Sequence, residues 1–179
     1  MTTQNLLEEW LETDAKEHVK IRTYSRYRSL VDLHIAPVLG AWDIADLGWR
    51  DIQALLRQQA QYGNLCDGAS LSASSANMML SVLNLAFEYA CSMNYLEENP
   101  CSRVKRIKGD VKKIEAFTLT EQRAIEAEII KSKDRRLNGI LLCLYTGMRI
   151  GELLGLTWSD IDLDDGKIAE NKTVYREKD

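Results

Sequence analysis

Apolar residues recur along most of this 179-residue chain at the three- and four-residue spacing that places them on one face of a helix. In the first segment, for example, Leu6, Leu7, Trp10 and Leu11 fall on one face and glutamates fall on the other. The chain is therefore expected to be mainly α. The predicted helices cover residues 2–19, 23–35, 49–61, 71–94, 118–130 and 137–145, followed by a short helix that begins at residue 150.

Turn and capping residues predict where these helices begin and end. Thr23 is the expected N-cap of the second helix, which Pro37 and Gly40 end. Thr118 and Glu121 have the spacing of a capping box. The apolar residues that follow Pro37, up to the middle of the helix predicted over residues 49–61, are expected in the core: Leu39, Trp42, Ile44, Leu47, Ile52, Leu55 and Leu56.

The last part of the chain changes character. Ile161 and Leu163 precede Asp164-Asp165-Gly166, and Ile168 and Thr173-Val174-Tyr175 follow. An Asp-Gly turn between short apolar segments predicts a β-hairpin. The segment from residue 137 to 145 is a nearly continuous apolar run, and we expect it to form a buried helix.

Composition narrows the functional classes. The formal charge of −4 argues against a globally basic nucleic-acid binder, so any contact with DNA must come from local patches. The four cysteines lack C-x-x-C spacing and there are only two histidines, so no metal site is predicted. Free thiols in a reducing cytosol are the simplest interpretation, and no membrane-length apolar run is present. We therefore expect a cytoplasmic protein.

Two local patches are strongly basic. The first, residues 20–28, combines cations with hydroxyl groups and no acid, which suits DNA phosphates, although the same pattern also fits a solvated helix face. The second, residues 103–108, follows the Asn99-Pro100 break and could form a cationic strap along a phosphate backbone. The candidate DNA-binding residues in these patches are Lys20, Arg22, Thr23, Arg26, Arg28, Arg103, Lys105, Arg106 and Lys108.

A third candidate surface is the start of the helix predicted over residues 71–94. Ser72, Ser74, Ser75 and Asn77 are small and polar, and such residues at a helix start can read base edges in the major groove. They can equally cap the helix and contact solvent. The sequence leaves both alternatives open for each of these residues.

One arginine stands in a distinctive setting. Arg149 follows Thr146-Gly147 and precedes the short helix, with Glu152 three residues further on. Glycine at 147 and 151 permits a tight turn and a close approach of other atoms. A guanidinium held on such a turn suits a phosphate, because its planar fork can donate two parallel hydrogen bonds. The alternative is an ordinary surface pair at i, i+3.

The segment TGMRIGELLGLTWSDID, residues 146–162, resembles the first catalytic box of the tyrosine recombinases, the phage integrase family. The segment I-x-P-x-L-G at residues 35–40, a helix opening with Asp51-Ile52 and the Asn99-Pro100 exit resemble the core-binding domain of that family. The resemblance implies a SAM-like helical DNA-binding domain over residues 1–108, a linker over 109–116, and a truncated α+β catalytic domain over 117–179 that ends in a small β-hairpin. It also implies that Arg149 binds the scissile phosphate and that Glu152 supports it.

The resemblance implies strand breakage and rejoining through a phosphotyrosine in a full recombinase of a mobile element, with double-stranded DNA as partner and a tetrameric synapse. No metal or other cofactor is implied. The family reaction needs groups that are absent here, since no H-x-x-R box occurs and no tyrosine has the context of the nucleophile. We therefore expect these residues to bind DNA without cleaving it, so whether the chain is itself an enzyme stays open.

Truncation would leave an apolar patch near Leu141, Leu144 and Leu153, from which we expect self-association. The alternatives are a non-catalytic DNA-binding decoy and an all-helical protein-interaction module. The acidic net charge favours the second of these.

Overall fold

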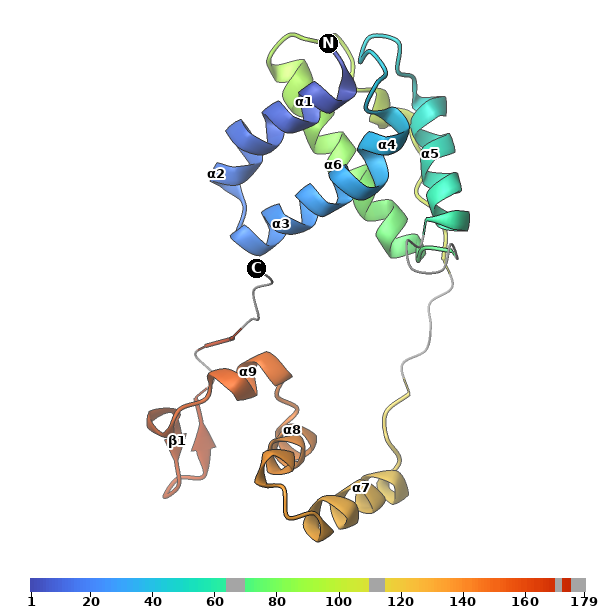
Figure 1. The fold of residues 1–179 in the computed structure, drawn as a ribbon. Coiled ribbons are helices and arrows are strands. Elements are labelled where there is room, and N and C mark those ends of the chain that lie inside the picture. The colour runs from blue at the N-terminus through green and yellow to red at the C-terminus, as the bar shows by residue number, and fades with distance from the viewer. Residues whose placement is uncertain (64–69, 110–114, 170–171, 175–179) are drawn as a thin grey trace. The chain divides into compact units, whose positions relative to one another are not determined.

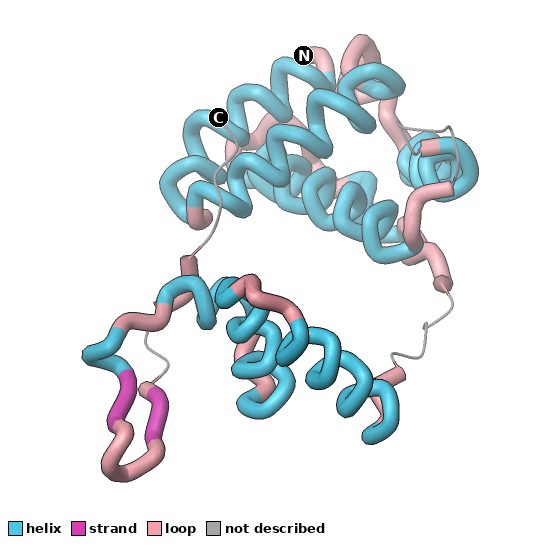
Figure 2. The backbone as a smooth tube through the Cα atoms, turned by 60° about the horizontal axis from the view of Figure 1, so that its bottom comes forward, coloured by secondary structure: helices cyan, strands magenta, loops and turns pink. Residues whose placement is uncertain are grey.

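The computed structural model describes residues 1–63, 70–109, 115–169 and 172–174. The chain separates into two compact units, Met1–Val111 and Lys112–Asp179 (Figure 1). The described residues are mostly helical and contain one two-stranded sheet, which confirms the predicted fold class (Figure 2). The expected linker includes residues 110–114, which lie outside the described residues, so its bounds stay a prediction.

The first predicted helix is confirmed. It consists of α1 (Thr3–Trp10), a π-helical turn (Leu11–Ala15) and α2 (Lys16–His18), which follow one another without a break. Thr2 is the N-cap, and its hydroxyl accepts a hydrogen bond from the Asn5 backbone N–H at 3.3 Å.

The second helix begins earlier than the sequence predicted. α3 (Ile21–Leu30) has Lys20 as its N-cap, because the Lys20 backbone is extended and its carbonyl already accepts hydrogen bonds from the Thr23 and Tyr24 N–H groups. The expectation that Thr23 caps this helix is therefore wrong, and Thr23 lies inside the first turn.

The second helix ends at Gly40, as predicted, but it continues through Pro37 instead of stopping there. After α3 the chain forms a π-helical turn (Val31–Ile35) and then α4 (Ala36–Leu39), which contains Pro37. Proline lacks the N–H that an α-helix needs, but the wider π turn bonds the Ala36 N–H to Val31, five residues back. The helix therefore passes through Pro37 and ends at Gly40.

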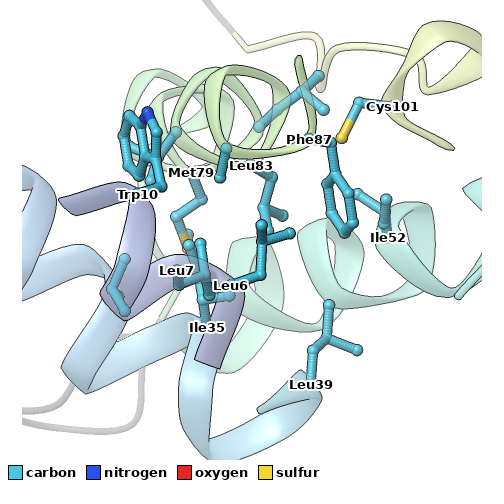
Figure 3. Close-up of a cluster of buried hydrophobic side chains, with 14 of the residues drawn as sticks. Leu6, Leu7, Trp10, Ile35, Leu39, Ile52, Met79, Leu83, Phe87 and Cys101 are labelled. Carbon is cyan, nitrogen blue, oxygen red and sulfur yellow. The ribbon is translucent and has the colours of Figure 1, made fainter. Parts of the chain in front are cut away.

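The core of the first unit lies where α1 and the second helix meet α5 (Trp49–Tyr62) and α6 (Ala73–Ser92), as the close-up in Figure 3 shows. Six of the seven predicted core residues between 39 and 56 are buried. Trp42 is the exception, because it lies on the loop between α4 and α5, where its ring stays exposed. A short 3₁₀ turn, Pro100–Arg103, follows α6.

The second unit has much less buried apolar surface. Its helices are α7 (Leu119–Lys131), α8 (Asn138–Thr146) and α9 (Ile150–Gly155), and the Thr118–Glu121 capping box is confirmed at the start of α7. Among the described residues of this unit, Ile129, at 7% exposed, is the only large apolar side chain that is buried. The prediction that residues 137–145 form a buried helix is therefore wrong on burial, although the helix itself is present.

The predicted β-hairpin is confirmed over residues 161–168, but Thr173 and Val174, which were also expected in it, are not in a strand, and Tyr175 lies outside the described residues. β1 (Ile161–Asp162) pairs antiparallel with β2 (Lys167–Ile168), and Gly166 takes the positive φ of 62° in the turn. The two remaining 3₁₀ turns are Arg135–Leu137 and Trp158–Asp160. Among the described helices, none is long and apolar enough to cross a lipid bilayer.

Candidate nucleic-acid interface

The first basic patch lies on α3. Because this helix begins at Ile21, Lys20 and Arg22 lie at its N-terminus, where backbone N–H groups and the helix dipole also favour anions. Lys20, Arg22 and Arg26 are exposed, and Thr23 is half-buried.

Arg28, in contrast, forms hydrogen bonds to other residues of the protein. Its guanidinium donates to the Glu12 carboxylate and to the Tyr24 hydroxyl, and it lies 5.8 Å from the centre of the Tyr24 ring. Glu12 also accepts from the Tyr24 hydroxyl at 2.6 Å and from Lys16 at 2.9 Å. These hydrogen bonds, the one from Tyr24 first, lower the pKa of Glu12 to about 2. Arg28 thus joins α3 to the first helix, while its neighbours Lys20 and Arg26 have no such contact among the described residues.

The four polar candidate residues at the start of α6 have different environments. Ser72 is the N-cap, since its hydroxyl accepts from the Ser75 N–H at 3.1 Å and lies 3.0 Å from the Ser75 hydroxyl. Ser74 is exposed. Asn77 is half-buried and bonds to the backbone of Ile107 through both ends of its amide. Ser72 therefore caps α6 and Ser74 is exposed, and contact of these residues with DNA stays a prediction.

The second basic patch is held against the helical unit. Asn99 caps the 3₁₀ turn through its carbonyl oxygen, which accepts from the Cys101 N–H at 2.8 Å, and its amide nitrogen donates to the Asn84 side chain at 3.0 Å. Beyond this turn, Gln53 on α5 bonds to the backbone of Lys105. Arg103, Lys105, Arg106 and Lys108 all remain exposed.

Sequence reasoning did not identify Gln53 as a residue of this site. The only local signal is a polar side chain at a buried position of α5, next to Ile52 and close to Leu55. A buried amide needs hydrogen-bond partners, and here they lie 52 residues further along the chain.

Arg149 stands on the turn between α8 and α9. Gly147 has a φ of 74°, a left-handed conformation that favours glycine and that ends α8. Arg149 is the N-cap residue of α9, and the buried Glu152 carboxylate accepts from its backbone N–H at 2.6 Å and from its guanidinium at 2.8 Å. The Arg149 side chain is nevertheless 85% exposed. The guanidinium is therefore tethered on one side while most of its surface stays accessible.

Gly151 permits the close approach that the sequence suggested. A Cβ atom at Gly151 would lie 2.9 Å from the Thr173 side chain and 3.0 Å from the Val174 carbonyl oxygen. The Val174 N–H donates to the Gly151 carbonyl at 2.9 Å, so residues 172–174 run against α9. This contact places the Lys172 ammonium 3.9 Å from the Asp160 carboxylate.

Two tyrosines, Tyr145 and Tyr175, flank this turn in the sequence. Tyr145 is exposed on α8, and its hydroxyl donates to Glu126 at 2.8 Å, a bond that raises the pKa of Tyr145. Tyr175 lies outside the described residues. Among the described residues, no group of three or more His, Cys, Asp or Glu side chains has the arrangement of a metal site.

Comparisons with known proteins agree with this arrangement. Residues 2–58 match the family model for the phage integrase N-terminal SAM-like domain, and residues 108–174 match that for the phage integrase family. The ICEBs1 integrase of Bacillus subtilis is 27% identical over 139 residues, which make up 78% of this chain and 36% of that protein. A XerC-like tyrosine recombinase of Caldanaerobacter subterraneus is 31% identical over 124 residues, 65% of this chain and 31% of that protein. The chain thus spans about a third of the length of these relatives.

Solved structures share the fold. The Tn1549 transposon integrase in complex with circular intermediate DNA has a TM-score of 0.82 and 22% identity, and the match covers 99% of this chain and 56% of that one. A lambda integrase dimer bound to a core site has a TM-score of 0.74 and 25% identity, and the match covers 91% of this chain and 56% of that one. With a SAM-like helical unit followed by the arginine-bearing turn of the catalytic domain, this chain belongs to the phage integrase family of tyrosine recombinases.

Proposed function

We propose that this chain is the DNA-binding front portion of a tyrosine recombinase of a mobile element, which acts in the cytoplasm. The observation that carries the proposal is the setting of Arg149, whose backbone and guanidinium are both held by Glu152 while the side chain stays open to a ligand. A tethered arginine loses little conformational freedom when it binds a phosphate, and its fork can donate two hydrogen bonds to one.

The DNA contacts are assigned to the exposed cations of the helical unit. Lys20, Arg22 and Arg26 on α3 would meet phosphates, and the strap that includes Arg103, Lys105, Arg106 and Lys108 would follow the backbone. Thr23 and the α6 residues Ser72, Ser74 and Ser75 would add hydrogen bonds to the DNA. We assign lesser roles to Arg28 and Asn77, because both already have partners within the protein.

We further propose that these 179 residues do not cleave DNA. Transfer of a strand to a tyrosine needs a nucleophile and several cations around the phosphate, and the sequence contains no H-x-x-R box to supply the second arginine. The lambda integrase relative is described as a dimer on its core site and as a tetramer on a Holliday junction, which supports self-association of this chain on DNA as part of the proposal.

The test is salt-dependent binding to duplex DNA, measured by fluorescence anisotropy with a labelled oligonucleotide. We expect the logarithm of the affinity to fall linearly with the logarithm of the salt concentration, by about 0.9 for each phosphate contacted. Arg149→Ala should lower the affinity and reduce this slope by about 0.9, the value for one phosphate contact. Binding that is absent at low salt, or that does not depend on salt, would favour the alternative of an all-helical interaction module.

A suicide-substrate assay tests the second proposal. A nicked duplex that traps a covalent protein–DNA intermediate should give no adduct with this chain. An adduct that survives denaturing electrophoresis would refute the proposed inactivity without affecting the proposal of DNA binding. Binding without an adduct fits both a recombinase portion and a decoy module, and reading the gene for an H-x-x-R box followed by a tyrosine distinguishes them.

A further inference from the structure

The exit segment, residues 104–109, is fixed along the helical unit by hydrogen bonds from two different helices. Gln53 on α5 donates through Nε2 to the Lys105 carbonyl at 3.1 Å and accepts at Oε1 from the Lys105 N–H at 2.8 Å. Asn77 on α6 does the same for Ile107, donating through Nδ2 at 2.9 Å and accepting at Oδ1 at 2.8 Å. Each side-chain amide thus satisfies both backbone groups of one residue, as a neighbouring β-strand would.

The same segment also makes apolar and close backbone contacts. Val104 and Ile107 are half-buried and pack against the core cluster. Gly109 lies so close to the start of α6 that a Cβ atom on it would be 2.5 Å from the Ala73 Cβ. From Val104 to Gly109, the exit segment therefore runs back along α6 towards the N-terminus of that helix.

The two amides are suited to hold this position. Gln53 is 7% exposed and Asn77 is half-buried, and buried amides left without hydrogen bonds are strongly unfavourable. Their bonds to Lys105 and Ile107 fix two backbone positions that are two residues apart. The segment can neither slide nor rotate without breaking a pair of these bonds.

Three exposed cations lie on this segment. Lys105, Arg106 and Lys108 are exposed, and among the described residues no carboxylate lies within 4.0 Å of their charged groups. Cations on a fixed backbone bind phosphates without the entropic cost of ordering a loose chain.

We propose that Gln53 and Asn77 are positioning residues for DNA binding, which hold Lys105, Arg106 and Lys108 in place to meet the phosphate backbone. The inference rests on the proposed DNA binding of the chain. Gln53 and Asn77 would not contact phosphates themselves. They would fix the backbone positions of the cations that do.

The test is a double-mutant cycle on the full chain. Its first arm is the clamp variant, Gln53→Ala with Asn77→Ala, and its second arm is the charge variant, in which Lys105, Arg106 and Lys108 become Ala. With the clamp intact, removal of the three cations should reduce the salt slope of duplex binding by up to about 2.7, that is, 0.9 for each phosphate. In the clamp variant, the same removal should change the slope by less than half as much, because coupled residues are not additive.

Gln59→Ala is the matched control. Gln59 is also an amide on α5 and is 8% exposed, but its Oε1 lies 3.0 Å from His34 Nδ1, and among the described residues no hydrogen bond joins it to the exit segment. It should destabilise the fold in a similar way and leave the effect of charge removal unchanged. In the free protein, hydrogen exchange at the Lys105 and Ile107 amides should accelerate in the clamp variant and not in the control.

The possible outcomes separate the two proposals. If the wild-type chain shows no salt-dependent binding, the proposed function fails, and the inference fails with it. If the wild type binds but charge removal has the same effect in both backgrounds, or none in either, the positioning role alone is overturned. Should the clamp variant not fold, Asn77→Ala alone releases Ile107 and allows the same cycle.

Discussion

Phe87 and Phe117, the only two phenylalanines of the chain, offer a matched test of what stabilises it. Phe87 on α6 is 0% exposed and lies in the core cluster (Figure 3), whereas Phe117 is 64% exposed. An aromatic ring buries at least about 150 Å², which at about 25 cal/mol per Å² corresponds to about 4 kcal/mol. Phe87→Ala should therefore lower the free energy of unfolding by about 3–5 kcal/mol.

A loss of that size is a large part of the 5–15 kcal/mol that typically stabilises a domain. The midpoint of thermal unfolding of the first unit should fall by roughly 12 °C or more. Urea unfolding followed by circular dichroism measures the change directly. Phe117→Ala should change the free energy of unfolding by less than about 0.5 kcal/mol. If both variants lose similar stability, the buried cluster of α1, α5 and α6 is not the main source of stability, and the reasoning is wrong.

Three further predictions follow from individual contacts. Glu12, whose pKa is lowered to about 2 chiefly by the Tyr24 hydroxyl, should contribute stability that is fully present above about pH 4.5 and lost as the pH falls towards 2. Thermal unfolding at pH 5 and pH 3 should therefore differ more for the wild type than for Glu12→Gln. Arg26→Ala should reduce the salt slope of DNA binding by about 0.9, while Arg28→Ala should mainly lower thermal stability and leave the slope nearly unchanged. Trp158→Lys, which replaces a tryptophan that is exposed on the second unit, should weaken a concentration-dependent self-association seen by light scattering, and a wild-type chain that stays monomeric at all concentrations would contradict this.

The helices were predictable because local features determine them. Apolar spacing located α1, α5, α6 and α7, and the Thr118–Glu121 box marked the start of α7. Burial was less predictable, because hydrophobicity only indicates that a residue favours contact with another layer. Trp42 lies on a loop without such a layer, and the described residues of the second unit cover α8 only in part.

The candidate site shows the same division. The turn at Gly147 and the pairing of Arg149 with Glu152 span a few residues, so the sequence suggested them. The contact between Gln53 and Lys105 depends on how the helices pack, and no local pattern indicates it. The sequence left open whether Asn77 reads bases or contacts solvent, whereas the structure pairs its amide with Ile107, a partner 30 residues away that no local pattern indicates.

The paired amides on the exit segment also restrict how related genes can vary. An insertion or deletion between Lys105 and Ile107 would move one of them away from its helix, because Gln53 and Asn77 lie at fixed positions on α5 and α6. In homologous chains that keep both amides, changes in the length of the segment that joins the two units should therefore occur only after Gly109.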